Sequence, residues 1–181
     1  GSPKTVAAYS EITRRMLKQS SLDVEALVRS DLTAALALTI DKAGYYGSGT
    51  DKQPRGIASQ TGLSAVQFKA DNPSFAELVA METKISQGNA DVLSMAYVAN
   101  AGFRGHAKTT LKFEGVGGTI WEPGNTVNGY RTEITNQINA GDVFMGNFAD
   151  LVVLMWGGME LNVDPYSNSK SGRLRIITFQ D

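Results

Sequence analysis

Apolar residues recur at helical spacing along much of the first third of this chain. Successive members lie three, one or four positions apart, and in order they are Val24, Leu27, Val28, Leu32, Ala35, Leu36, Ile40 and Ala43. This spacing places side chains on one face of an α-helix. The preceding Ser20 to Asp23 fits a helix start, because serine and aspartate oxygens accept the free N–H groups of a first turn. We predict a helix from Asp23 to Ala43, about 31 Å long at roughly 1.5 Å per residue, ended by Gly44.

Shorter helical and strand patterns follow one another without regular alternation. Helices are predicted over residues 10–17, capped by Ser10, then 75–87 and 101–111. Ser74 and Glu77 have the spacing of a capping box at the start of the second, and Gly88 ends it. Strands are predicted at 66–68, 92–98, 151–156, 159–163 and 173–179. The mixed order indicates an α+β fold.

Two of the predicted strands flank Gly157-Gly158. Residues 151–156 are all apolar, and residues 159–163 follow the two glycines. Because glycine adopts positive φ angles readily, this arrangement predicts a tight hairpin.

The composition excludes several classes of protein. The 181 residues are 42% hydrophobic, which suits one globular domain or two small lobes and is too apolar for disorder. The net charge of -1 gives no basic excess for gripping DNA phosphates. The absence of cysteine excludes disulfides and thiolate metal sites. No apolar run approaches the roughly 20 residues that span a bilayer. The opening Gly1-Ser2 resembles a protease-cleavage scar, so we expect a trimmed piece of a longer protein.

The glycine-rich loops do not match nucleotide-binding motifs. Around Gly47 the G-x-G-x-x-G pattern fails because its last position is Lys52, and around Gly115 it fails because that position is Ile120. Both stretches are therefore interpreted as turns.

The residue types and their spacing give little support for a catalytic site. His106 is the only histidine, and no serine lies in a G-x-S-x-G elbow, so a small hydrolase using His106 is a rival reading only. The carboxylates at Glu133, Asp142, Asp150, Glu160 and Asp164 match no compact metal-ligand loop. Trp121 and Trp156 could stack on a base or a sugar, but a core or interface role fits them better. We predict no catalytic, cofactor-binding or metal-binding residues.

Short blocks of this chain, taken in order, resemble the tailed-phage major capsid protein family. One is the Gly47-Ser48-Gly49 loop after the long helix, followed by Pro54-Arg55-Gly56. The full set of blocks is 14–23, 43–49, 53–57, 129–130, 135–138, 144–148, 155–160, 163–166 and 172–175. No single block is specific, but their ordered combination is, and it covers most of the chain.

The resemblance implies a fold with two lobes. Residues 1–56 would form a peripheral lobe with the long helix as its spine, and residues 57–158 an axial lobe with a central sheet. Residues 159–181 would return to the peripheral sheet. The family's N-terminal arm and extended hairpin loop have no counterpart in these residues. We therefore expect the chain by itself to be a monomer or a small oligomer.

The resemblance also implies a function, that of a structural subunit in an icosahedral shell around double-stranded DNA. Its partners would be copies of itself in hexamers and pentamers, together with scaffold, portal and packaged DNA. No membrane partner and no cofactor are expected. The protein would reside in the virion, and in the host cytoplasm during assembly. An encapsulin-like compartment with a protein cargo is the nearest alternative, and a prophage remnant that no longer assembles is another.

Overall fold

The computed structural model describes residues 4–13, 15, 24–50, 52–88, 94–155, 157–164 and 173–180. The chain divides into two compact units. Unit 1 comprises residues 1–60 and 154–181, and unit 2 comprises residues 61–153. The sequence predicts divisions after residues 56 and 158, whereas the units divide after residues 60 and 153.

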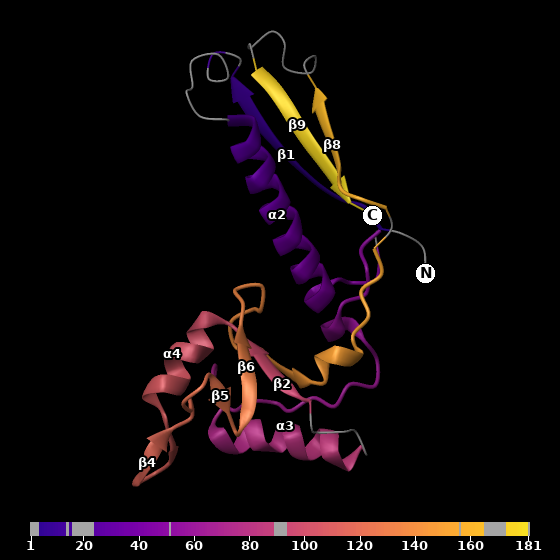
Figure 1. Cartoon of the computed structure of the whole chain (residues 1–181). Helices are drawn as coiled ribbons and strands as arrows, with labels where there is room; N and C mark the ends of the chain where they lie inside the picture. Colours follow the sequence, from indigo (N-terminus) through magenta and orange to yellow (C-terminus); the bar gives the residue numbers. More distant parts are fainter. Residues whose placement is uncertain are drawn as a thin grey trace. The chain divides into compact units, whose positions relative to one another are not determined.

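Unit 1 is a three-stranded antiparallel sheet with one long helix packed against it (Figure 1). The strands lie in the order β1 (Val6–Thr13), β9 (Arg173–Gln180) and β8 (Glu160–Asp164). The helix is α2 (Val24–Tyr46). Their shared core consists of Ile12, Val24, Val28, Leu32 and Ile176. Strands from the two ends of the unit's sequence therefore meet in one sheet.

Helix α2 confirms the long predicted helix, although its buried face is narrower than the sequence pattern indicates. Val24, Val28, Leu32 and Leu36 are buried, four residues apart, whereas Leu27 is 55% exposed. The predicted start at Ser20 to Asp23 lies outside the described residues.

Gly44 does not end this helix, so that prediction is wrong. The helix continues to Tyr46, and the Gly47 N–H still donates to the Ala43 carbonyl at 2.8 Å. The chain turns only at Gly47, whose carbonyl accepts the Gly56 N–H at 2.8 Å. The helix therefore ends where Gly47 contacts the returning segment that contains Gly56.

The predicted helix over residues 10–17 is wrong from Ser10 to Thr13. These residues belong to β1, which pairs with β9 from Val6 opposite Gln180 to Thr13 opposite Arg173. Strand pairing with a partner more than 150 positions away overrides the local pattern, because the sheet supplies hydrogen bonds that a sequence window cannot anticipate.

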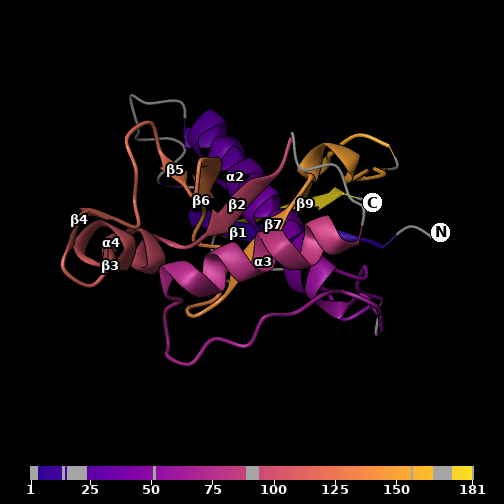
Figure 2. The same cartoon turned by 90° about the horizontal axis from the view of Figure 1, so that it is seen from below.

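Unit 2 is built on a four-stranded mixed sheet. Its order is β5 (Thr126–Val127), β6 (Tyr130–Ile134), β2 (Ala96–Ala99) and β7 (Val143–Gly146). Strand β2 is parallel to β6 and antiparallel to β7. Helices α3 (Phe75–Gln87) and α4 (Ala101–Thr109) pack on the sheet (Figure 2). The core consists of Leu78, Tyr97, Ala99, Phe103, Ala107, Ile120 and Val127.

Smaller elements complete the two units. In unit 2, β3 (Leu111–Phe113) and β4 (Val116–Thr119) form a separate hairpin. The 3-10 turn η2 (Phe148–Asp150) follows β7. In unit 1, the 3-10 turn η1 (Ile57–Ser59) follows the loop after α2.

The two short helices of unit 2 confirm the sequence prediction, except that α4 ends at Thr109 and Leu111, predicted to be helical, begins β3. Ser74 and Glu77 form the predicted capping box, with the Ser74 N–H donating to the Glu77 carboxylate at 2.8 Å. Gly88 follows the last helical residue. Asn100 caps α4 by accepting the Phe103 N–H at 2.8 Å. The sequence analysis identified the first of these caps, because a capping box is a local pattern.

Strand prediction is less successful. Strand β9 confirms the predicted final strand, and β2 confirms part of 92–98, of which residues 92 and 93 lie outside the described residues. Residues 66–68 form no strand. The predicted hairpin is also wrong, although the predicted strand over residues 159–163 forms as β8 (Glu160–Asp164). Leu151 to Met155 have no regular structure, and β8 pairs with β9 instead.

Candidate functional site

His106 lies on α4 and its ring is half-buried. The Thr110 hydroxyl lies 3.3 Å from Nδ1 and 3.5 Å from Nε2. No other hydrogen bond to this ring is found among the described residues, so they assemble no Ser/His/Asp triad around it.

The predicted carboxylates also take structural roles. Glu133 forms an ion pair with Arg131 on the same strand, and Asp150 accepts from the Asn147 side chain at 2.8 Å. Within the described ranges, no group of three or more acidic or histidine side chains is arranged to hold a metal ion. Within the described part of the chain, no such group includes the remaining candidates, Asp142, Glu160 and Asp164.

The glycine-rich loops are turns. The loop after α2 is closed by a bridge between Ser48 and Arg55, and the Gly49 N–H donates to the Pro54 carbonyl at 3.1 Å. Gly115 turns the β3–β4 hairpin at a φ of 74°. Both interpretations from the sequence are confirmed.

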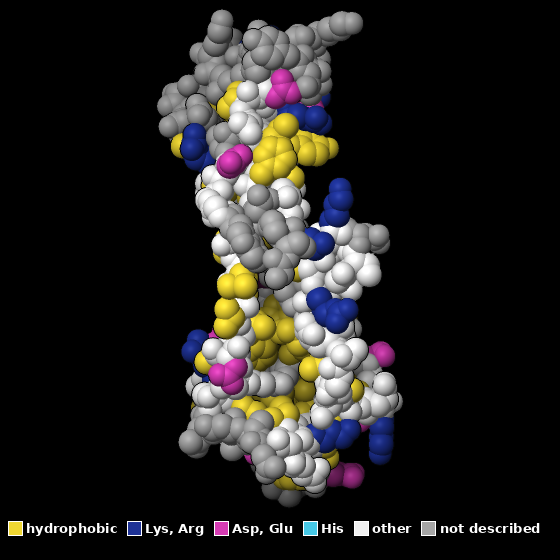
Figure 3. All heavy atoms as spheres, turned by 90° about the vertical axis from the view of Figure 1, so that its right-hand side faces the viewer, with side chains coloured by type: hydrophobic (Ala, Val, Ile, Leu, Met, Phe, Trp, Pro, Cys, Tyr) yellow, Lys and Arg dark blue, Asp and Glu magenta, His cyan; other side chains and the backbone are white. Residues whose placement is uncertain are grey.

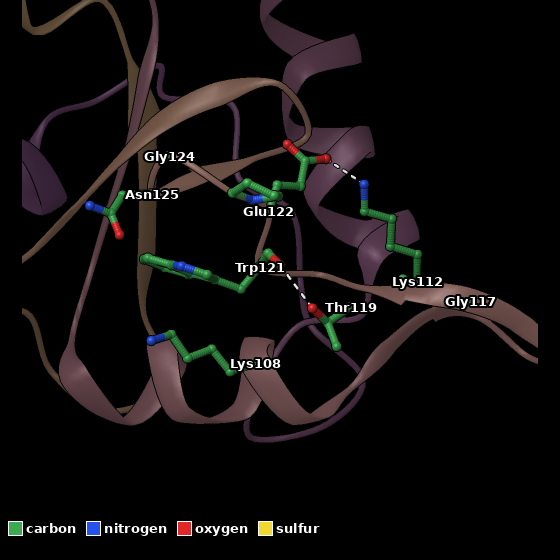
Figure 4. A pocket seen from close by; sticks show the side chains of 10 residues that line it. Lys108, Lys112, Gly117, Thr119, Trp121, Glu122, Gly124 and Asn125 are labelled. Carbon is green, nitrogen blue, oxygen red and sulfur yellow. Dashed lines mark hydrogen bonds and ion pairs between the residues drawn. The ribbon is translucent and has the colours of Figure 1, made fainter.

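An open cavity of about 650 Å³ lies on unit 2 beside Trp121 (Figure 4). The Lys108 ammonium lies 5.9 Å from the indole centroid, a cation–π geometry. Lys112 is ion-paired with Glu122. Glu122 neutralises the charge of Lys112. The cavity therefore offers the indole face of Trp121 and the ammonium of Lys108. Among the described residues that line it, no nucleophile is in contact with a base.

Glu122 fixes the turn between β5 and β6. It accepts the Gly129 N–H at 2.9 Å and the Thr126 hydroxyl at 3.1 Å, besides its ion pair with Lys112. Burial acts to raise the pKa of Glu122. The three donors outweigh burial and hold that pKa below its ordinary value. The carboxylate is therefore kept ionised as a structural group.

Glu82 of α3 holds the same turn from another element. Its carboxylate accepts the Tyr130 hydroxyl at 2.9 Å and the Asn128 amide at 2.5 Å. Burial, with the Glu82 carboxylate adding to it, raises the pKa of the Tyr130 hydroxyl. The sequence analysis did not identify this network, because Glu82 and Asn128 are 46 positions apart.

An exposed run of apolar side chains is the feature that best fits a binding function. We call residues Leu151 to Met155 the apolar segment. Their exposed fractions are 50%, 76%, 62%, 67% and 57% in order. Figure 3 shows hydrophobic side chains in several separate groups on one face. Contiguous exposed apolar patches on proteins mark contacts with partners. The sequence analysis predicts a strand for this run. The sequence feature that could have indicated a contact surface is that every residue of the run is apolar.

The described residues contain no helix that is both long and apolar enough to cross a bilayer.

The structure places only one of the two candidate tryptophans. Trp121 lines the cavity and is half-buried, and Trp156 lies outside the described residues.

Comparison with known proteins gives consistent matches. The model of the Phage capsid family matches residues 2–181. The major capsid protein of Halomonas phage phiHAP-1 is 39% identical over 180 residues, which are 99% of this chain and 30% of that protein. Solved structures that match 98% of this chain include the following two. The capsid of the empty GTA particle has a TM-score of 0.74 at 18% identity, over 66% of that chain. Mycobacterium phage Adephagia has a TM-score of 0.64 at 10% identity, over 63% of that chain.

These matches span only part of each relative. The chain spans about a third of the phiHAP-1 protein and just under two thirds of the matched chains in the solved structures.

Proposed function

Because this chain belongs to the Phage capsid family, we propose that it is a structural subunit of an icosahedral phage or prophage shell enclosing double-stranded DNA. The predicted resemblance and the α+β fold of tailed-phage capsid proteins are confirmed by the family match and the structural neighbours. The observation that carries the proposal is the family match over residues 2–181.

The chemistry of the described residues supports a mechanical role. Among these residues, the hydrogen-bond partner found for the His106 ring is the Thr110 hydroxyl, and the Glu122 and Glu133 carboxylates hold a turn and an ion pair. The exposed apolar segment offers surface whose burial favours association. A shell subunit needs only modest contacts, because many symmetric contacts add through multivalency.

The two units support an assignment to the two lobes of the family. Unit 1, with α2 as the spine helix and the sheet β1-β9-β8, corresponds to the peripheral lobe. Unit 2, with the sheet β5-β6-β2-β7 and two helices, corresponds to the axial lobe.

The partners follow from this role. They are copies of the same protein in hexamers and pentamers, with scaffold, portal and packaged DNA. The GTA capsid, computed with five-fold symmetry, supports self-association. The site of action is the virion, after assembly in the host cytoplasm.

The alternatives are less well supported. The matched relatives are phage and GTA-particle capsids, which disfavours an encapsulin-like compartment. A hydrolase using His106 lacks an assembled triad among the described residues.

Electron microscopy of the full-length natural protein, expressed with its neighbouring assembly genes, tests the proposal. We expect closed polyhedral shells whose nuclease-protected content is double-stranded DNA. Shells filled with a protein cargo would favour the compartment, and no shells under these conditions would contradict the proposal.

A further inference from the structure

The turn between β5 and β6 contains an asparagine followed by a glycine. Asn128 is the only asparagine of the sequence that a glycine follows. Asn128 and Gly129 have φ angles of 52° and 76°, as a two-residue hairpin turn between Val127 and Tyr130 requires. Gly129 is exposed, so water reaches the turn. An asparagine in this setting can lose its side-chain amide, because the glycine has no side chain to shield the backbone nitrogen that attacks it.

Loss of ammonia from this pair requires two atoms to meet, the Gly129 nitrogen and the Asn128 Cγ. As the bond between them forms, the nitrogen loses its proton, the Cγ–Nδ2 bond breaks and the amide leaves as ammonia. Water then opens the cyclic imide to aspartate or isoaspartate. The net change is hydrolysis of an amide by water, which needs no oxidant and no cofactor.

Both reacting groups are held by carboxylates in the folded chain. The Gly129 N–H donates to Glu122 at 2.9 Å. The Asn128 side-chain amide donates to Glu82 at 2.5 Å, and the Tyr130 hydroxyl donates to the same carboxylate at 2.9 Å. Hydrogen bonds to carboxylates are stronger than those between neutral groups. Each reacting group must therefore break such a bond before it can meet the other.

The turn is also joined to the core of unit 2. Val127 is fully buried, and the Tyr130 ring contacts the Tyr97 ring with centroids 6.2 Å apart. Hydrolysis would replace the donating amide of Asn128 with a carboxylate that faces Glu82. Two like charges at this position repel each other. The contact that holds the turn to α3 would therefore be lost.

We propose that Asn128-Gly129 is a deamidation site that the Glu82 and Glu122 carboxylates keep unreactive in the folded chain. Its modification releases the β5–β6 turn from α3. The proposal concerns unit 2 alone and does not depend on the shell function.

Peptide mass spectrometry of the 181-residue chain, incubated at neutral pH over weeks, tests this protection. We expect the folded parent to keep the Asn128 amide and the urea-unfolded parent to lose it. Glu82→Ala and Glu122→Ala should each deamidate about tenfold faster than the folded parent, because each frees one reacting group. Thr83→Ala should match the parent. It is the control on the same helix, because the exposed Thr83 hydroxyl donates to the Val79 carbonyl at 3.0 Å within α3.

Lower overall stability of a variant would also speed deamidation. Each variant is therefore compared with the parent in the urea concentration that gives the same free energy of unfolding. A higher rate in the variant supports the proposal. Equal rates would overturn it, because the whole fold and not the two carboxylates would then protect the pair. Rapid loss of the amide in the folded parent would overturn it too. Tyr130→Phe, which removes only the hydroxyl that fixes Glu82, replaces any alanine variant that does not fold.

Replacement of the asparagine tests the release of the turn. Asn128→Asp introduces the carboxylate directly, and aspartate tolerates the same positive φ. We expect its melting temperature to fall by roughly 4 °C or more, because the new charge faces Glu82. Asn125→Asp is the matched control, because Asn125 is exposed and has a φ of 60°. Its melting temperature should stay that of the parent, and equal melting temperatures of the two variants would refute the release.

Discussion

Gly56 and Gly44 have different roles, although both lie near the end of α2. A Cβ atom on Gly56 would lie 2.5 Å from the Gly47 nitrogen and 2.6 Å from the Tyr46 nitrogen. A Cβ atom on Gly44 would meet nothing within 4 Å. Gly56 lets the returning loop touch the backbone at the helix end, whereas Gly44 is an ordinary helical position. This contact gives a physical reason for the glycine of the Pro54-Arg55-Gly56 block.

Alanine at these two glycines should therefore have opposite effects. We expect Gly56→Ala to lower the free energy of unfolding by roughly 1–3 kcal/mol, because backbone atoms must move. Gly44→Ala should raise it by about 0.5–1 kcal/mol, because alanine favours the helix. Urea denaturation followed by circular dichroism measures both. Equal stability of the Gly56→Ala variant and the parent would show that the close approach is not a constraint.

At the scale of elements, the helices agree with the sequence better than the strands do. Local spacing identifies α2, and a capping box identifies the start of α3, because the interactions involved are a few residues apart. Strands need a partner from elsewhere. Ser10 to Thr13 form a strand because β9 lies beside them, and residues 151–155 do not because no partner strand is found in the described part of the chain.

The buried stripe of α2 gives a test at this scale. Leu32 is 4% exposed and packs in the core of unit 1, whereas Leu38, on the same helix, is 51% exposed. Leu32→Ala should lower the free energy of unfolding by about 2–5 kcal/mol through loss of burial and a remaining cavity. Leu38→Ala should change it by less than about 0.5 kcal/mol. Thermal and urea unfolding measure both, and similar losses would refute the four-residue stripe.

At the scale of the whole molecule, the two units differ in how the chain forms them. Unit 2 is one continuous stretch, residues 61–153, and its core residues all come from that stretch. Unit 1 joins residues 1–60 to residues 154–181, and its sheet pairs β1 with β9. Continuity of chain makes unit 2 a candidate for independent folding.

We expect a fragment of residues 61–153 to fold by itself, with dispersed amide signals in its NMR spectrum and a cooperative thermal transition. A fragment of residues 1–60 is the matched control. It should remain largely unfolded, because β1 then lacks β9 and Ile176 is missing from the core. Collapsed, random-coil amide shifts for residues 61–153 would show that unit 2 depends on the rest of the chain.

The sequence by itself determined the long helix, α3 with its capping box, most of α4, the final strand and the family, because these depend on short-range spacing or on the order of residue blocks. It also indicated that the glycine loops are turns and that His106 has no recognisable nucleophile. Only the tertiary structure decided the strand partners, the end of α2 at a contact with Gly56, and the Glu82 and Glu122 contacts that fix one turn. Only the structure shows that the side chains of Leu151 to Met155 are exposed. The physical reason is that strand pairing, close backbone approach and burial depend on segments far apart in the chain, which no local pattern specifies.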